Sequence, residues 1–256
     1  MKTTLQTTIG KTFLILLAAV ALASCTKDDD INPDGNESGD LLLVEEKVNG
    51  QTLLTYEYDE RNRAIVWTQY VNGEIHTIHS FAYDDSDRMI AQERKHNGQV
   101  FLKESYSYES GERPVSGVWT YIGNSGNVST VSTVQYTYNQ NTVTETVDIE
   151  DVGTIINSYV FDSKGNSIQH KIGQGVVDYG DFDGKSGVYE RHPWSWKTLQ
   201  INNYQSVKTT AAGMVISDHI YKYTYNDAGY PVKAEVYDRA TNELVETREY
   251  TYKKAN

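Results

Sequence analysis

A short phrase built around two aromatic residues recurs along this chain of 256 residues and constrains its fold more than any other feature. The two aromatic residues are separated by one position, and an acidic or amide residue usually follows them. The second aromatic residue lies at positions 58, 83, 108, 138, 161, 225 and 252. The copies are Tyr56-Glu57-Tyr58-Asp59, Phe81-Ala82-Tyr83-Asp84, Tyr106-Ser107-Tyr108-Glu109, Tyr136-Thr137-Tyr138-Asn139, Tyr159-Val160-Phe161-Asp162, Tyr223-Thr224-Tyr225-Asn226 and Tyr250-Thr251-Tyr252.

Each copy of the phrase predicts the end of a β-strand and the start of a turn. Aromatic residues at positions i and i+2 of a strand point to the same face. A following Asp or Asn favours a turn, because its side chain can bond backbone groups two residues on. Between the phrases lies an Asn-Gly pair, which is typical of two-residue hairpins because both residues adopt positive φ. These pairs are Asn49-Gly50, Asn72-Gly73 and Asn97-Gly98.

The repeat therefore predicts an all-β fold, an antiparallel meander of repeated hairpins whose neighbouring rings stack across strands. The composition agrees, because Val, Thr and Tyr dominate after the first 24 residues while the helix formers Leu and Ala are scarce. Tyr outnumbers Phe by 20 to 5. A Tyr ring covers apolar surface while its hydroxyl reaches water, which favours a thin core.

The N-terminus predicts a secreted, lipid-anchored protein. Residues 1–24 have a positive start and a short apolar run, which are typical of a signal peptide. The quartet Leu22-Ala23-Ser24-Cys25 resembles a bacterial lipobox, which implies that Cys25 is acylated and becomes the first mature residue. The alternative is an ordinary signal peptide followed by a chance Cys. A lone Cys cannot form an internal disulfide, so lipidation at Cys25 accounts for its presence.

The sequence predicts an acidic flexible tether at residues 25–40 and a single β domain at residues 41–256. Thr26-Lys27-Asp28-Asp29-Asp30 resembles the export signal of surface-exposed lipoproteins of the Bacteroidota, which implies an outer-membrane protein that faces the cell exterior. The run is also typical of a plain solvated linker. The stretch from Asp30 to Gly35 mimics the start of a calcium loop, but its twelfth position is Leu41, where Glu is required.

The repeated phrase resembles the Tyr-Asp (YD) repeats of Rhs-type proteins. Arg63, Arg88 and Arg113 lie five residues after the second aromatic residue, where that pattern carries Gly-Arg. Residues 225–231 also resemble repeat units of Bacteroidota surface lipoproteins of unknown function that have a porin-like or open-barrel β fold. This resemblance implies a curved sheet or open barrel. The hairpin periodicity by itself predicts only the meander.

Charge limits the partners of the protein. The net charge of −12 argues against nucleic acid, because phosphate binding needs a basic surface. A membrane-spanning barrel would need an apolar outward band, whereas charged residues occupy many alternate strand positions, as in residues 104–109. We therefore expect a soluble domain that contacts the membrane only through its N-terminal lipid anchor.

The repeat is interrupted between about Gly173 and Gly213, and interruptions of a repeat often carry function. A flat aromatic platform with polar groups at its edge is suited to a sugar ring. The alternative is that the two Trp side chains lie on one face of a strand and plug the end of the sheet. The candidate ligand-binding residues in this segment are Tyr189, Arg191, His192, Trp194 and Trp196.

Three functions remain open at this point. The first is a binding or structural module for a glycan or a protein, and the second is a carrier for a lipid or another hydrophobic ligand. The third is a glycan-cleaving enzyme that uses Asp181 or Asp183. We favour the first and expect no enzyme activity, no catalytic residue and no cofactor. We also expect no metal site, because His76 and His79 would point to opposite faces of a strand.

Overall fold

The computed structural model describes residues 40–256, and all structural statements below concern that part of the chain. The predicted signal peptide 1–24, the lipidation site Cys25 and the tether up to residue 39 lie outside the described residues. The described part contains sixteen strands. No helix within residues 40–256 is long and apolar enough to cross a membrane.

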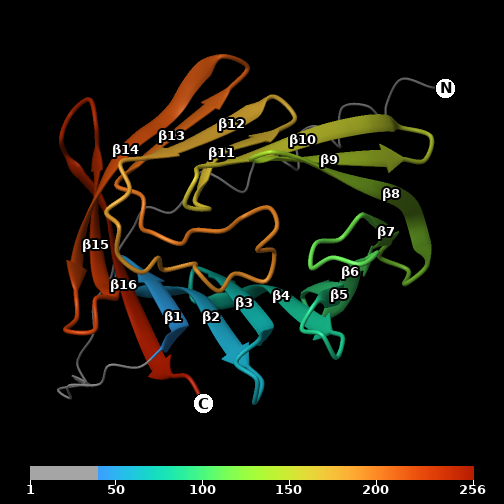
Figure 1. Ribbon diagram of the computed structural model, residues 1–256, viewed down its shortest axis with the longest axis horizontal. Coiled ribbons are helices and arrows are strands. Elements are labelled where there is room, and N and C mark those ends of the chain that lie inside the picture. The colour runs from blue at the N-terminus through green and yellow to red at the C-terminus, as the bar shows by residue number, and fades with distance from the viewer. Residues whose placement is uncertain (1–39) are drawn as a thin grey trace. The chain divides into compact units, whose positions relative to one another are not determined.

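The sixteen strands form one closed antiparallel barrel in which each strand pairs with its neighbours in sequence (Figure 1). This confirms the all-β meander, and it closes the sheet that the sequence left open. The strands are β1 (Leu41–Val48), β2 (Gln51–Tyr58), β3 (Ala64–Val71), β4 (Glu74–Tyr83), β5 (Met89–His96), β6 (Gln99–Ser107), β7 (Ser116–Ile122), β8 (Val128–Asn139), β9 (Thr142–Ile149), β10 (Gly153–Phe161), β11 (Ser167–Ile172), β12 (Gly175–Gly180), β13 (Ser206–Ala211), β14 (Met214–Tyr225), β15 (Pro231–Asp238) and β16 (Leu244–Lys254).

A seam between the first and last strands closes the barrel. Strand β1 pairs with β16 from Leu41 opposite Lys254 to Val48 opposite Arg248. The amide of Ala255 also donates a hydrogen bond of 2.9 Å to the carbonyl of Asp40. The two ends of the described chain therefore lie side by side at one end of the barrel, which we call the Asp end.

The opposite end of the barrel carries the Asn-Gly turns, and we call it the Asn-Gly end. Asn49 and Gly50 have φ of 50° and 78°, and the other two pairs adopt nearly the same angles. Positive φ at both central residues is the condition for a type I′ turn, so the predicted hairpins are confirmed.

At the Asp end, the residue after each aromatic pair builds the predicted turn. The Asp59 carboxylate accepts hydrogen bonds from the amides of Arg61 and Arg63. Asp84 does the same for the amides of Ser86 and Arg88. The residue before each of these two arginines has positive φ, 61° at Asn62 and 63° at Asp87. Asn and Asp suit these positions because both tolerate the left-handed region.

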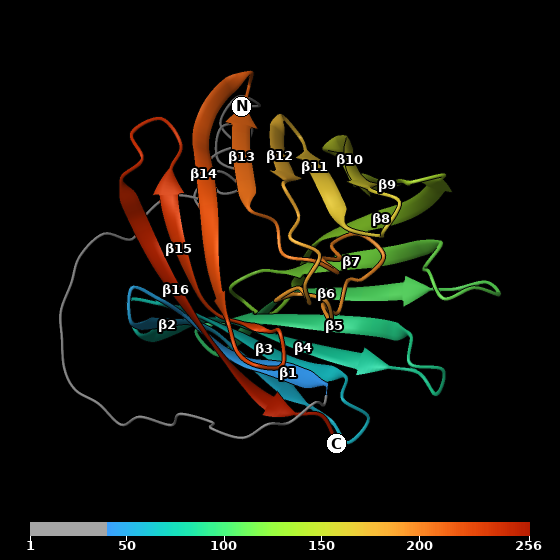
Figure 2. The same cartoon turned by 60° about the vertical axis from the view of Figure 1, so that its left-hand side comes forward.

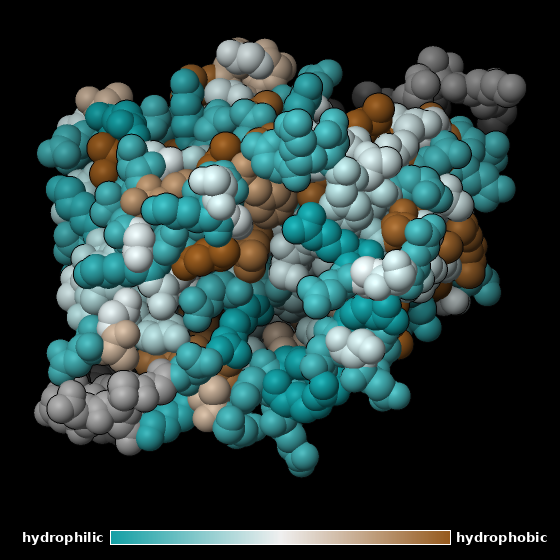
Figure 3. Space-filling view, viewed as in Figure 1, coloured by the Kyte–Doolittle hydropathy of each residue, from teal (hydrophilic) through white to brown (hydrophobic). Residues whose placement is uncertain are grey.

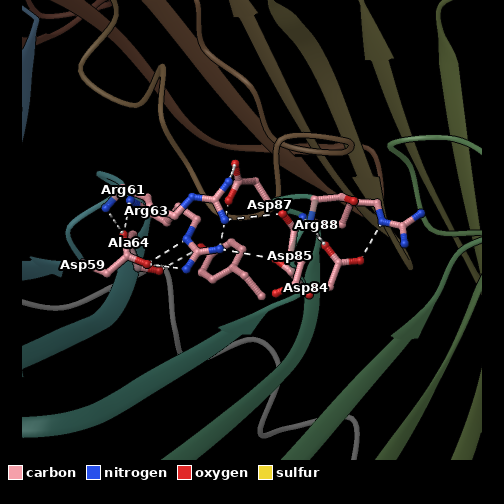
Figure 4. A network of polar contacts seen from close by, with 10 residues as sticks. Asp59, Arg61, Arg63, Ala64, Asp84, Asp85, Asp87 and Arg88 are labelled. Carbon is pink, nitrogen blue, oxygen red and sulfur yellow. Dashed lines mark hydrogen bonds and ion pairs between the residues drawn. The ribbon is translucent and has the colours of Figure 1, made fainter.

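Successive turns at the Asp end are clamped together by the repeated Tyr and Arg residues. Tyr83 donates a hydrogen bond of 2.8 Å to the carbonyl of Ala64, and the Arg63 guanidinium lies 4.9 Å from the centre of its ring. Tyr108 and Arg88 repeat this arrangement in the next hairpin. Figure 4 shows how Arg63 also reaches across to Asp87, which ties two turns into one polar network.

The outer wall of the barrel is charged at mid-strand. Glu93 on β5 forms ion pairs with Lys95 and with Lys103 of the adjacent strand, at 3.2 and 3.5 Å. Lys233 and Glu235 form a similar pair on β15. The face drawn in Figure 3 is largely hydrophilic. An outward band of lipid-facing side chains would be apolar at these positions.

The barrel interior contains two clusters of buried apolar side chains. One cluster is built mainly from strands β4 to β10 and includes Phe81, Tyr106 and Val134. The other is built around β1, β2 and β14 to β16 and includes Leu43 and Val236. The same-face prediction for the aromatic phrase is confirmed by the stacked rings of adjacent phrase members, whose centres are 6.3 Å apart for the first copy. A loop that enters the barrel contributes to both clusters.

Candidate functional site

The loop inside the barrel comprises residues 181–205, between β12 and β13, and we call it the insert. The sequence predicted a wider interruption from Gly173 to Gly213, but β12 and β13 continue the meander on either side. Apart from one isolated bridge between Ser186 and Asn202, the insert contains no strand. Figure 1 shows it crossing the space that the strands enclose.

The insert is fixed to opposite walls of the barrel by buried carboxylates. Tyr189 donates a hydrogen bond of 2.7 Å to Glu46 on β1. The ammonium of Lys197 lies 2.6 Å from Glu145 on β9. Both carboxylates are almost fully buried, at 0% and 1% exposure. Because β1 and β9 are half a circumference apart in the strand order, these contacts span the barrel.

Each buried carboxylate also has partners on the wall itself. Glu46 accepts from Arg248 of β16 at 2.8 Å. Glu145 accepts from Asn157 and from the Tyr159 hydroxyl of β10. Burial alone raises the pKa of Glu145, but the charge of Lys197 and these hydrogen bonds lower it overall. Glu145 is therefore held ionised inside the barrel.

Trp194 lies in the interior and contacts the wall through both its ring and its indole nitrogen. It meets Trp67 and Phe81 edge-on, with ring centres 5.6 and 5.5 Å apart. Its Nε1 donates to Oε1 of Gln92 at 3.1 Å. The amide nitrogen of Gln92 in turn lies 2.7 Å from Nδ1 of His79. Since an amide nitrogen can only donate, Nδ1 of His79 accepts and the imidazole is neutral.

Trp196 packs into a neighbouring part of the same cluster. Its ring centre is 5.2 Å from that of Tyr106 and 6.2 Å from that of Tyr136. Trp194 and Trp196 are 8% and 6% exposed. The alternative of a strand carrying both rings on one face is wrong in its geometry, because the insert is not a strand there and the rings meet different walls. Both rings are nevertheless buried, as that alternative expected of rings that pack against the sheet.

The other three predicted ligand residues line a small pocket at the edge of the insert. Tyr189, Arg191 and His192 lie there beside Leu43 and Tyr252. The cavity volume is about 20 Å³, which is close to the size of one water molecule. Arg191 forms an ion pair of 2.7 Å with Asp40, and the Tyr189 hydroxyl already donates its hydrogen bond to Glu46. The pocket as it stands is too small for a sugar ring.

Asp181 and Asp183, the carboxylates of the enzyme alternative, do not face each other across a cavity. Asp183 accepts hydrogen bonds from Asn203 and from the Tyr225 hydroxyl, which holds the insert against β14. Asp181 is exposed and has a φ of 55°. Within residues 40–256, no group of three or more His, Cys, Asp and Glu side chains is placed to hold a metal ion.

A larger concavity, of about 300 Å³, lies between the hairpins β1–β2 and β3–β4 near the Asn-Gly end. Its lining combines one aromatic ring, Tyr70, with hydroxyl, amide and carboxylate groups. The register shift at this point places the extra residue, His76, in β4, so Tyr70 keeps the regular alternation of β3. Tyr70 lies outside the aromatic phrase, so the repeat gives no signal for it. The lining residues are Glu45, Gln51, Thr52, Thr55, Tyr70, Asn72 and Gly73.

The fold defines a closed sixteen-strand barrel with a loop inside it, and solved structures share this fold. A porin-like protein from Bacteroides vulgatus ATCC 8482 matches with a TM-score of 0.51 and 14% identity, over 82% of this chain and 98% of that chain. A porin-like protein from Bacteroides uniformis ATCC 8492 matches with a TM-score of 0.48 and 12% identity, over 82% and 98%. No known protein family and no curated protein matches the chain. The first likeness supports the porin-like barrel fold that the sequence resemblance implied.

Proposed function

We propose that the protein is a lipid-anchored barrel of the bacterial outer membrane that faces the cell exterior and acts as a binding or structural module for a glycan or a protein. It carries out no catalysis and conducts no solute. The observation that carries this proposal is the insert, whose buried contacts join β1 to β9 across the interior. A barrel crossed in this way by a packed loop is a scaffold rather than an open pore.

Two further observations support a water-facing module of the cell envelope. Ion pairs such as Glu93 with Lys103 occupy the middle of the outer wall. The fold is that of a porin-like protein from a Bacteroides species. The lipobox around Cys25, the acidic tether and the degenerate YD repeats complete the proposal from the sequence alone.

The lipid anchor predicts that growth on labelled palmitate transfers the label to this protein. The wild-type chain should carry label and partition into the detergent phase, because the acyl chains on Cys25 dominate its partitioning. A Cys25→Ala variant should lose the label and remain unprocessed. Label retained by the variant, or no label on the wild-type chain, would contradict the anchor.

A glycan ligand is best accommodated by the concavity beside Tyr70. It offers about 300 Å³, whereas the pocket at the edge of the insert offers about 20 Å³. The Tyr70 ring makes no hydrogen bond and no ring contact that we find within residues 40–256. An unoccupied aromatic face beside hydroxyl and amide groups is the arrangement that stacks on a sugar ring and bonds its hydroxyls.

A Tyr70→Ala variant should lower the affinity for any oligosaccharide that the wild-type protein selects on a glycan array, by about tenfold or more. Tyr237→Ala is the matched control. That residue lies at the corresponding register shift between β15 and β16, but Lys222 covers its ring at 4.1 Å and its hydroxyl donates a hydrogen bond to Glu235. An Arg191→Ala variant separates the two sites, because only binding at the insert would depend on it. No selected glycan at all would leave a protein as the ligand to seek.

A further inference from the structure

Exposed apolar side chains gather at one part of the Asn-Gly end. Most of the large apolar side chains that are exposed within residues 40–256 lie at the tips of four consecutive hairpins, β9–β10, β11–β12, β13–β14 and β15–β16. We call these four tips the apolar rim. Figure 2 shows the β13–β14 and β15–β16 tips at the upper edge and the C-terminus at the lower edge. Its most exposed members are Val152, Ile156, Met214, Val215, Ile216 and Leu244.

The rim differs from a packing surface because it is apolar on both sides of the strands. Ile155 is in register with the buried Val147, and Ile156 is in register with Thr146 on the opposite face. On β14, the consecutive residues Met214, Val215 and Ile216 are 66%, 57% and 52% exposed. Met214 and Val215 are consecutive paired residues, opposite Ala211 and Thr210, and therefore point to opposite faces. A strand that packs against a flat partner needs apolar residues on one face only.

We propose that the apolar rim inserts into the surface of a lipid bilayer, so that the barrel rests on the membrane by four hairpin tips. A fluid apolar medium surrounds an inserted tip on every side, and this matches apolar residues that point both into and out of the barrel. The tips of β1–β2 and β5–β6 carry Asn49-Gly50-Gln51 and Asn97-Gly98-Gln99 instead. The tips of β3–β4 and β7–β8 carry fewer exposed apolar side chains, Val71, Ile75 and Val128, so the side of the Asn-Gly end with the apolar rim enters the membrane most deeply.

Chain length allows the rim and the proposed lipid anchor to reach the same membrane, and this step rests on the proposed function. The chain enters the barrel at Asp40, at the Asp end. From Cys25 to Asp40 it can span about 50 Å, at 3.3–3.6 Å per residue. Strand β14 has 12 residues and is about 40 Å long at 3.3 Å per residue. The tether is long enough to pass along the barrel.

The charges beside the rim indicate which lipids it prefers. Glu150, Asp151 and Glu243 are exposed at the turns of β9–β10 and β15–β16. Acidic side chains are repelled by an anionic surface. The rim should therefore bind bilayers of zwitterionic phosphatidylcholine more strongly than bilayers that contain phosphatidylglycerol.

Vesicle flotation tests the rim independently of the anchor. The chain without residues 1–25, which lacks both the apolar signal segment and the acylation site, should float with phosphatidylcholine vesicles. Replacing Met214, Val215 and Ile216 together by Thr should lower the vesicle-bound fraction at least tenfold, while Thr preserves the strand propensity. The matched control replaces Ile90 and Val118, which are 38% and 39% exposed within β5 and β7, by Thr. That control should float like the parent chain.

Three outcomes would overturn the proposal. The first is that the chain without residues 1–25 does not float, and the second is that the rim and control variants float equally. The third is a concentration-dependent dimer that the rim variant abolishes without any vesicle binding, which would make a second copy of the chain the occupant. A Leu244→Thr, Val245→Thr variant gives a second reading if the first rim variant fails to fold. Palmitate labelling tests the lipid anchor and flotation tests the apolar rim, so a negative result in one experiment does not decide the other.

Discussion

Replacing Lys197 by Ala should lower the free energy of unfolding by about 3–5 kcal/mol, because Glu145 then remains buried without its opposite charge. The two groups are 2.6 Å apart and 12% and 1% exposed. Urea unfolding followed by Trp fluorescence measures the change. The freed insert should also become sensitive to trypsin at Lys185 and Arg191, while the strands stay intact.

Two further variants separate the stability contributed by the buried ion pair from the effect of removing a lysine charge. Lys103→Ala removes the outer-wall pair with Glu93 and should cost less than about 1 kcal/mol, because exposed pairs contribute little. The double change of Lys197→Met with Glu145→Gln should recover part of the loss, since no buried charge remains. A cost for Lys197→Ala no larger than that for Lys103→Ala would contradict the role of the insert as a fixed plug.

Lowering the pH from 7.5 to 5 should destabilise the barrel substantially through its buried imidazoles. Burial, followed by the nearby charges of Arg94 and His192, lowers the pKa of His79 from 6.5 to about 3. Burial also lowers the pKa of His192 to about 3 and that of His170 to about 4, with Lys197 contributing to both. These rings stay neutral in the folded chain while the unfolded chain takes up protons below pH 6.5.

The stability that these imidazoles contribute is therefore present above pH 6.5 and declines as the pH falls toward their folded values. For His79, which is 6% exposed, the loss between pH 7.5 and 5 is about 2 kcal/mol. Urea midpoints at pH 7.5, 6.5, 5.5 and 5 measure it. A His79→Gln variant should show a shallower dependence on pH than the parent chain. A stability that is constant over this range would refute the prediction.

The fold could be predicted from the sequence because its determinants are local. Asn49-Gly50 fixes a type I′ turn by the backbone angles of two residues. Asp59 fixes the opposite turn by bonding the amides of Arg61 and Arg63. Every such unit can be recognised within about ten residues, and repetition then implies a meander. Closure into a barrel depends instead on the number of strands and their tilt, which no single hairpin encodes.

The position of the insert could not be predicted, because its contacts are long-range and have no period. Lys197 and Glu145 are 52 residues apart in sequence, and Tyr189 and Glu46 are 143 apart. Glu46, Glu104 and Glu145 occupy inward strand positions, where a sequence pattern of alternation would place apolar residues. Only the structure shows that each of these buried carboxylates pairs with a cationic side chain, which identifies it as a structural group. The sequence shows that the insert is rich in aromatic residues, but it does not show that the insert enters the barrel.

The seam between β1 and β16 has a consequence for how the chain assembles. Every other strand pair joins neighbours in sequence, so each hairpin can form as soon as its own two strands are available. The seam must wait for the last strand, since it unites residues that are about 200 positions apart. Until then the ribbon of hairpins has two unpaired edges, and this is the interval in which it is most open to pairing with another chain.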